Sequence, residues 1–294
     1  MNHLRRSAGR CPGLQRIAVS VALMSIGIWN EIGSAAADDF AGKKPPGTVP
    51  SFASALAHFD LEIPIADASG VVKIGTLISD PAKGFAADPG YGAFFWSAGG
   101  QRLIFRVPPN GATTPNSHFP RTELSQKKTE RWKPGSGNHT LRGTFVIVAT
   151  PKVTEKGEMT LAQIHDDVSD NGPLLKVMCD YKARPWKLLA DYRTEPKKSS
   201  AIIRTAEPQQ ESIALNGPMD YEIVLTSAGV LTVKVRKFGT QSWKVLADSS
   251  RKGQALDASW IAETCYFKAG CYMFDPGPSA APAAEVHYTA LSVE

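Results

Sequence analysis

The chain has 294 residues, of which 43% are hydrophobic and 21% are charged, as in an ordinary globular protein. The 25 glycines and 21 prolines are scattered between short apolar runs, which favours many turns over long helices. The formal net charge is +5, but residues 1–37 carry four of the 33 basic and one of the 28 acidic side chains, so the remainder has 29 against 27. This near balance gives no support for nucleic acid or a membrane surface as a partner.

The first 37 residues have the pattern of a targeting segment. Four arginines precede residue 17, the run 17–29 is mostly apolar, and Ala35–Ala37 form an A-x-A cleavage site before Asp38. A transmembrane anchor is the alternative, but the apolar run is too short to span a bilayer comfortably and small residues follow it. The sequence therefore predicts a signal peptide over 1–37, cleaved near Ala37, and a secreted or periplasmic protein without a membrane partner.

Residues 38–58 are expected to form a flexible linker, because Lys, Pro and Gly cluster at 43–47. A helix of one or two turns is expected only near Ser51–His58. No composition break and no internal repeat divides the remainder, so we expect one domain over 59–294.

From Leu61 onward, short apolar-rich runs alternate with turn clusters, and about a dozen β-strands are expected. Gly229 separates two alternating runs, which indicates a hairpin. The expected strands that we can delimit are Leu103–Val107, Arg121–Ser125, Thr140–Ala149, Met159–His165, Leu174–Tyr181, Trp186–Tyr192, Ala201–Thr205, Tyr221–Thr226, Val230–Lys237, Ser242–Leu246, Thr264–Tyr272 and Val286–Val293. Many strands without a convincing amphipathic helix predict an all-β protein, a two-sheet sandwich or jelly roll.

The cysteines are expected to be buried thiols. Cys11 lies in the predicted signal peptide, which leaves Cys179, Cys265 and Cys271, so at least one is unpaired within a monomer. Cys265 and Cys271 lie on one expected strand, about 20 Å apart when extended, which is too far for a disulfide. All three lie on apolar strand faces, which favours packing over redox or metal chemistry.

Several common catalytic motifs are absent from the sequence. The six histidines are not paired at metal-ligand spacing and no C-x-x-C occurs, so neither a metal nor a cofactor is predicted. No G-x-S-x-G, P-loop or G-x-G-x-x-G after a strand is present. Asp166 and Asp167 are adjacent in a predicted turn, where such neighbours usually bind water or cap the backbone, so a glycosidase pair is not indicated.

The candidate site is indicated first by the stretch Thr160–Asp166. A side-chain period of two places Gln163 and His165 on one face of the strand and Ala162 and Ile164 on the other. The apolar face would hold the strand against a core, while the amide and the imidazole point outward together.

Two other stretches, R-T-E-L-S at 121–125 and Y-F-K-A-G-C-Y at 266–272, carry a similar pattern. In the second, Tyr266, Lys268 and Tyr272 share one face. Three polar-faced strands that are far apart in the sequence predict one sheet face built as a site. A set of Arg, Gln, His, Tyr and Lys with few acids suits a substrate that bears a carboxylate, because Arg can hold a carboxylate through two parallel hydrogen bonds, while His and Tyr can move protons.

The motifs R-T-E-L, Q-I-H and Y-F-K-A-G-x-Y resemble, in order and spacing, the signature motifs of polysaccharide lyase family 7, the alginate lyases. The resemblance spans roughly residues 60–294. It implies a β-jelly-roll sandwich of two antiparallel sheets whose concave sheet forms a cleft for an anionic polysaccharide. It also implies a metal-free β-elimination that cuts a 1→4 glycosidic bond and leaves an unsaturated sugar. We expect the protein to be a monomer.

In such a reaction Arg121 and Gln163 would neutralise or hydrogen-bond the substrate carboxylate, stabilising the charge as it develops. His165 would be the base for one C5 epimer and Tyr272 the acid on the leaving oxygen, whereas for the other epimer Tyr272 could serve as both. The residues expected to orient these groups or to bind substrate are Glu123, Lys268, Tyr266, Lys176 and Arg142, the last two chosen by strand parity alone.

Two positions depart from the family pattern: Ser125 stands where Arg is usual, and Phe274 where Gln or Asn is usual. These departures leave open a lyase for another polyuronate, such as a glucuronan. A non-catalytic polysaccharide-binding sandwich is a third hypothesis, although a mere binder has no need of an acid and a base.

Overall fold

The structure is a computed structural model that describes residues 43–66, 76–78, 80, 82–83, 89–99, 101–114, 117–168 and 172–294. The predicted signal peptide, residues 1–37, lies outside the described residues, as do residues 38–42 of the predicted linker. In the ranges that are described, no helix is long and apolar enough to cross a membrane.

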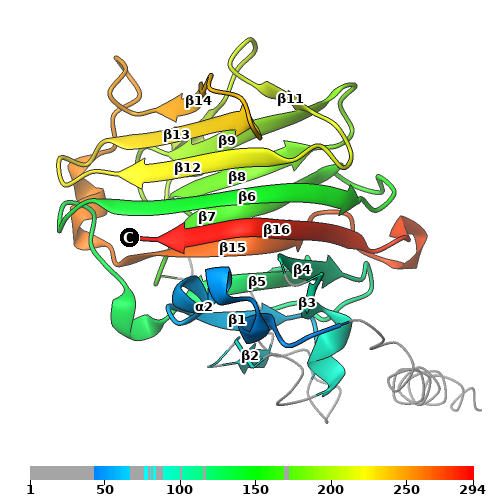
Figure 1. Ribbon diagram of the computed structural model, residues 1–294. Helices are drawn as coiled ribbons and strands as arrows, with labels where there is room; N and C mark the ends of the chain where they lie inside the picture. Colours follow the sequence, from blue (N-terminus) through cyan, green and yellow to red (C-terminus); the bar gives the residue numbers. More distant parts are fainter. Residues whose placement is uncertain are drawn as a thin grey trace, which may run out of the picture. The chain divides into compact units, whose positions relative to one another are not determined.

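Two antiparallel sheets contain the strands of the described chain, and Figure 1 shows one sheet in front of the other. The nine-stranded sheet consists, in spatial order, of β10 (Ile202–Arg204), β9 (Trp186–Arg193), β8 (Leu175–Asp180), β7 (Glu158–Asp166), β15 (Cys265–Met273), β5 (Arg121–Gln126), β1 (Phe59–Ile63) and β2 (Thr76–Ile78), with β11 (Glu211–Ile213) paired to β9. The seven-stranded sheet consists of β14 (Lys244–Asp248), β13 (Leu231–Lys237), β12 (Met219–Leu225), β6 (His139–Ala149), β16 (Ala284–Val293), β4 (Arg102–Val107) and β3 (Phe95–Ala98).

Helical structure in the described ranges is short. It consists of one α-helix, α2 (Pro50–Leu56), and the 3-10 helices η1 (Pro46–Thr48), η3 (Pro89–Ala93), η4 (Lys128–Glu130), η5 (Ser199–Ala201), η6 (Ala258–Ala262) and η7 (Pro278–Ala280). The all-β class and the two antiparallel sheets of a jelly roll are therefore confirmed. The concavity of the outer face stays a prediction.

The start of the described chain is packed structure. The helix α2 begins with Pro50, where a proline at the first helical position costs no hydrogen bond. Phe52 and Leu56, four residues apart on one helix face, are fully buried in the core. The predicted short helix is confirmed, but the predicted flexible linker is wrong for residues 43–58, because this segment carries apolar side chains that the sheets bury.

The core lies between the two sheets. Phe267, Ala269 and Cys271 of β15 are fully buried, and so is Tyr288 of β16 in the facing sheet. The Tyr288 hydroxyl donates to the carbonyl oxygen of Leu161 at 2.6 Å and so ties the sheets together. Alternate residues of β15 and β7 therefore point away from the core, onto the outer face of the nine-stranded sheet.

Each strand range delimited from the sequence overlaps a strand of the structure. Gly229, with φ +74°, joins β12 to β13, as predicted for a hairpin. The sequence ranges missed β1, β2, β3 and β11, which have three to five residues each. Cys179, Cys265 and Cys271 are free and buried, which confirms their interpretation as packing groups.

An irregularity in β15 determines where Tyr272 lies. The pairing of β15 with β7 shifts between Ala269 and Tyr272, so one strand has an extra residue there. Gly270 lies within this stretch with φ +149°, and a Cβ atom at that position would collide with the backbone of Thr122 and Glu123. Glycine thus allows the close approach that keeps Tyr272 opposite Arg121.

Candidate active site

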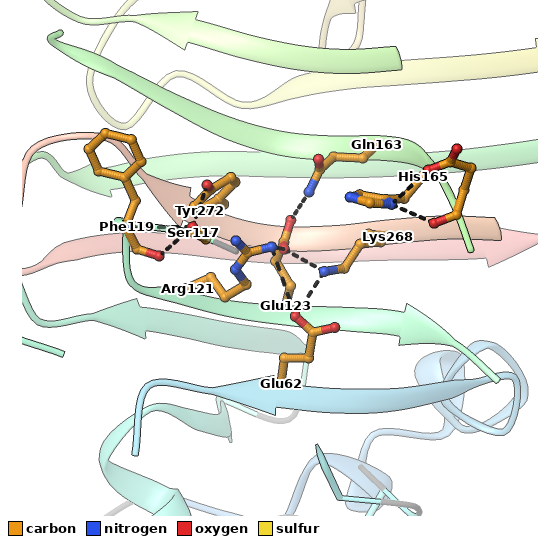
Figure 2. A network of polar contacts seen from close by, with 10 residues as sticks. Glu62, Ser117, Phe119, Arg121, Glu123, Gln163, His165, Lys268 and Tyr272 are labelled. Carbon is orange, nitrogen blue, oxygen red and sulfur yellow. Dashed lines mark hydrogen bonds and ion pairs between the residues drawn. The ribbon is translucent and has the colours of Figure 1, made fainter. Parts of the chain in front are cut away.

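The three motif strands are neighbours in the nine-stranded sheet, with β15 between β7 and β5. The facing pairs are Gln163 with Lys268, His165 with Tyr266, and Arg121 with Tyr272. The structure therefore brings the four residues predicted to be catalytic onto one outer face, as Figure 2 shows. Tyr272 and His165 lie on opposite sides of a central network of polar contacts.

Glu123 is at the centre of that network and is fully buried. Its Oε1 accepts a hydrogen bond from Gln163 Nε2 at 2.6 Å, while its Oε2 lies 3.0 Å from Lys268 Nζ and 3.4 Å from Arg121 NH1. The carboxylate therefore orients three candidate side chains at once. Of the two roles expected for Glu123, these contacts favour orientation of the site over substrate contact, because its oxygens are enclosed and already engaged.

Lys268 is also buried, with 2% of its side chain exposed, and its ammonium lies 2.8 Å from Glu62 Oε2. Burial opposes charge on both groups, but the facing carboxylates hold the pKa of Lys268 above its ordinary value. Lys268 and Arg121 likewise hold the pKa of Glu62 below its ordinary value, despite burial. Both groups are therefore charged near neutral pH. Of the two roles expected for Lys268, its buried ion pairs favour orientation of the site over substrate contact.

Arg121 is oriented by the network, but not all of its hydrogen-bond donors are paired within it. Its guanidinium lies over the ring of Tyr272, with 3.9 Å between Cζ and the ring centre, and NH1 faces Glu123. Its Nε is buried and has no hydrogen-bond partner among the described residues. With 11% of the side chain exposed, the planar group retains donors for a carboxylate arriving from solvent.

The hydroxyl of Tyr272 is positioned by a loop that precedes β5. Tyr272 Oη lies 2.7 Å from Ser117 Oγ, which in turn accepts the backbone N–H of Phe119 at 3.2 Å. Sequence reasoning missed both Ser117 and Glu62, because neither lies in a recognisable motif.

His165 is held as a neutral imidazole. Its Nδ1 lies 2.8 Å from the carbonyl oxygen of Asp166, and since a carbonyl can only accept, Nδ1 carries the proton and Nε2 keeps a lone pair. Burial, together with the charge of Lys268, lowers the pKa of His165 to about 4. With 22% of its side chain exposed, the imidazole is accessible as a base near neutral pH.

Tyr266 and Lys176 border this network. The Tyr266 ring lies 5.5 Å from that of His165 and is covered on another side by Arg131, whose Cζ is 4.1 Å from the ring centre. Lys176 of β8 faces Gln163 of β7 in the register. Both therefore lie on the predicted face, where they can contact a ligand.

Arg142 does not belong to the site, so its predicted role in substrate binding is wrong. It lies on β6 in the seven-stranded sheet, where it pairs with Glu222 at 2.8 Å and with Glu294 at 3.0 Å. Strand parity identified correctly that this side chain points away from the core, but parity does not tell which of two sheets a strand joins.

Within the described ranges, no group of three or more His, Cys, Asp or Glu side chains is placed to hold a metal ion.

Comparisons with known proteins agree with this geometry. The family model described as alginate lyase matches residues 55–294. The chain is similar to the crystal structure of alginate lyase A1-II', a member of polysaccharide lyase family 7, with 25% identity, a TM-score of 0.63, and coverage of 83% of this chain and 97% of that one. It is equally similar to alginate lyase PA1167 from Pseudomonas aeruginosa, with 25% identity, a TM-score of 0.63, and coverage of 81% and 98%.

A third similar structure is a variant of A1-II', substituted at one histidine and one tyrosine, in complex with substrate (GGMG). It shares 24% identity and the fold, with a TM-score of 0.63 and coverage of 84% of this chain and 96% of that one. No curated protein matches the chain.

Proposed function

Since this chain belongs to the alginate lyase family and is therefore a polysaccharide lyase, we propose that it cleaves alginate, a 1,4-linked polyuronate, by metal-free β-elimination. The products are oligosaccharides with an unsaturated sugar at the new non-reducing end. The observation that carries the proposal is the neutral imidazole of His165 and the hydroxyl of Tyr272 on either side of an Arg–Gln pair.

The first step removes the proton at C5 of the uronate. This proton is weakly acidic, because its loss places a second negative charge next to the carboxylate. Arg121 and Gln163 hold that carboxylate and stabilise the developing charge, an effect that counts most in the transition state. Glu123 contributes by fixing both donors before substrate arrives.

His165 Nε2 takes the C5 proton of one epimer, and the electron pair of the broken C5–H bond forms the C4–C5 double bond. The C4–O4 bond then breaks, its electron pair leaves with O4, and this oxygen takes its proton from the hydroxyl of Tyr272. A sugar bound over Arg121 and Gln163 lies between the two proton-transfer groups. For the opposite C5 epimer, Tyr272 serves as both base and acid.

A lyase for another polyuronate, such as a glucuronan, is the second candidate. It is favoured by the apolar surroundings of Tyr272, whose ring centre lies 4.6 Å from that of Phe274. Ser125, which faces Lys268, likewise offers no guanidinium to a sugar. These two positions lie beside the proposed catalytic groups, so they bear on which uronate binds rather than on the chemistry.

We further infer that the protein acts on its polysaccharide as a secreted or periplasmic monomer, after cleavage near Ala37. The A-x-A sequence that follows the apolar run supports this location. N-terminal sequencing of the secreted protein tests it, and a membrane-bound product that keeps Met1 would contradict it.

The test of function is the ultraviolet absorbance of unsaturated uronate, followed with purified protein on polymannuronate, polyguluronate and glucuronan. Growth of the signal on either alginate block is the expected result. Growth on glucuronan alone would support the second candidate. No growth on any of the polymers, with binding retained, would leave a non-catalytic binding protein.

A further inference from the structure

A small apolar cluster lies on the outer face of the nine-stranded sheet, separate from the core between the sheets. It is made of Met178, Leu189, Tyr272 and Phe274, with Phe119 packed against it. The ring centre of Phe274 lies 4.6 Å from that of Tyr272 and 5.1 Å from that of Phe119. This outer cluster therefore adjoins the proposed acid and excludes water from one side of it.

Two lysines converge on the outer cluster. The ammonium of Lys176 lies 5.1 Å from the Phe274 ring centre, and that of Lys156 lies 5.4 Å from it and 5.3 Å from the ring of Phe119. No carboxylate oxygen of the described residues lies within 4.0 Å of either ammonium. Asp191, which faces Lys176 in the register, is occupied by two hydrogen bonds from Arg204 at 2.8 Å each.

The loop that carries Lys156 is fixed to the end of β15. Asp275, fully buried just after Phe274, accepts backbone N–H groups from all four residues 154–157, at 2.6 to 3.2 Å. The hydroxyl of Tyr181 donates to the same carboxylate. Because one carboxylate organises the whole turn, the backbone of Lys156 is anchored beside the outer cluster before any ligand binds.

We propose that Lys156 and Lys176 form a second carboxylate-binding subsite, which holds the acidic group of a sugar adjacent to the one cleaved. The inference rests on the proposed function, since it takes an acidic polysaccharide as the ligand. Lys176 is one strand away from Gln163, and neighbouring strands are about 4.8 Å apart, so the two positions suit groups on successive parts of one chain.

The electrostatics of the pair agree with an anionic ligand. Burial, reinforced by the charge of Lys156, lowers the pKa of Lys176 to about 8. Two ammonium groups held near each other beside aromatic rings repel, and a carboxylate between them relieves that repulsion. The carboxylate of Asp191 attracts the Lys176 ammonium but offsets only part of the effect of burial on its pKa, and the cation–π contacts bring no counter-charge.

The test compares the initial rates of Lys156→Gln and Lys176→Gln with those of the wild type on alginate. Loss of an exposed charge contact should raise KM about two- to fivefold in Lys156→Gln. Lys176→Gln should raise KM about tenfold or more, because Lys176 is more buried. In both variants kcat should stay within about twofold, and Lys156→Arg should restore KM because it keeps the charge.

Lys152→Gln is the matched control, because Lys152 is an exposed lysine of the same loop with no contact to the outer cluster. The difference in KM between the wild type and Lys156→Gln should shrink as the salt concentration is raised. Equal KM values for Lys156→Gln and Lys152→Gln would overturn the subsite. So would a fall in kcat at constant KM.

Calorimetric binding of alginate oligomers separates this inference from the proposed function. If the wild type releases no unsaturated sugar but its binding still depends on Lys156, the function fails and the subsite stands. If lyase activity is present and binding ignores both lysines, the subsite fails and the function stands.

Discussion

Replacing Glu123 by Gln tests whether the buried network positions the site. This network places two cations, Arg121 and Lys268, beside two carboxylates, Glu62 and Glu123. The substitution keeps the shape of the side chain but leaves both cations facing one carboxylate. Removing one partner of a buried ion pair costs about 3–5 kcal/mol, because the other charge stays buried without compensation.

The lower end of that range is expected, since Glu62 still lies 2.8 Å from Lys268 Nζ. About 3 kcal/mol in a domain of this size lowers Tm by roughly 6 °C. Urea unfolding gives the free energy, and Glu207→Gln is the control, because Glu207 forms only a surface ion pair with Lys187. That control should lose less than about 1 kcal/mol.

The same variant should lose activity beyond its loss of stability. Glu123 accepts from Gln163 and faces Arg121, so both proposed carboxylate donors lose their fixed orientation. We expect kcat to fall at temperatures where the variant is fully folded. A Glu123→Gln enzyme that keeps both its unfolding free energy, within about 0.5 kcal/mol, and its kcat would refute the positioning argument.

Three further predictions concern individual side chains. Arg121→Lys and Tyr272→Phe should each lower kcat by about 10²–10³, with little change in KM, because both groups act on charge that develops in the transition state. Steady-state kinetics measures both constants. A raised KM at unchanged kcat would mean that the two residues only hold the polymer. The loss of kcat/KM at low pH that is due to protonation of His165 should have its midpoint near pH 4. The free energy of unfolding of the wild type, relative to His165→Asn, should decline as pH drops from 6.5 towards 4, because only the unfolded chain gains a proton there. A loss of kcat/KM with a midpoint near pH 6.5 that vanishes in the variant would contradict the lowered pKa. Arg142→Ala should leave both kinetic constants unchanged, because its side chain lies on the other sheet.

The sequence was sufficient to predict the face of the site, because strand parity is a local property. Gln163, His165 and Lys268 could be assigned to one side of their strands from alternation alone, and their pairing across β7 and β15 confirms it. The Gly270 irregularity does not disturb this assignment on the β5 side, where Tyr272 still faces Arg121.

What the sequence could not predict depends on which strands become neighbours. Glu62 and Lys268 are 206 residues apart in the sequence, and they meet only because β1 and β15 both pair with β5. Ser117 touches Tyr272 through a loop without regular structure. Arg142 was assigned to the site by strand parity, although its strand, β6, lies in the other sheet.

The buried charges also differ from what a simple reading of the motifs suggests. A lone Arg beside a lone Lys would bind a uronate carboxylate strongly before any chemistry, and binding energy realised in the ground state does not raise kcat. In this protein the two cations are already balanced by Glu62 and Glu123, so the network has little net charge to attract a single carboxylate. Its fixed donors respond more to the second negative charge that the proposed C5 deprotonation creates. The guanidinium of Arg121, with 11% of the side chain exposed, is the group placed to meet that charge, which is why the carboxylates beside it favour catalysis over tight binding.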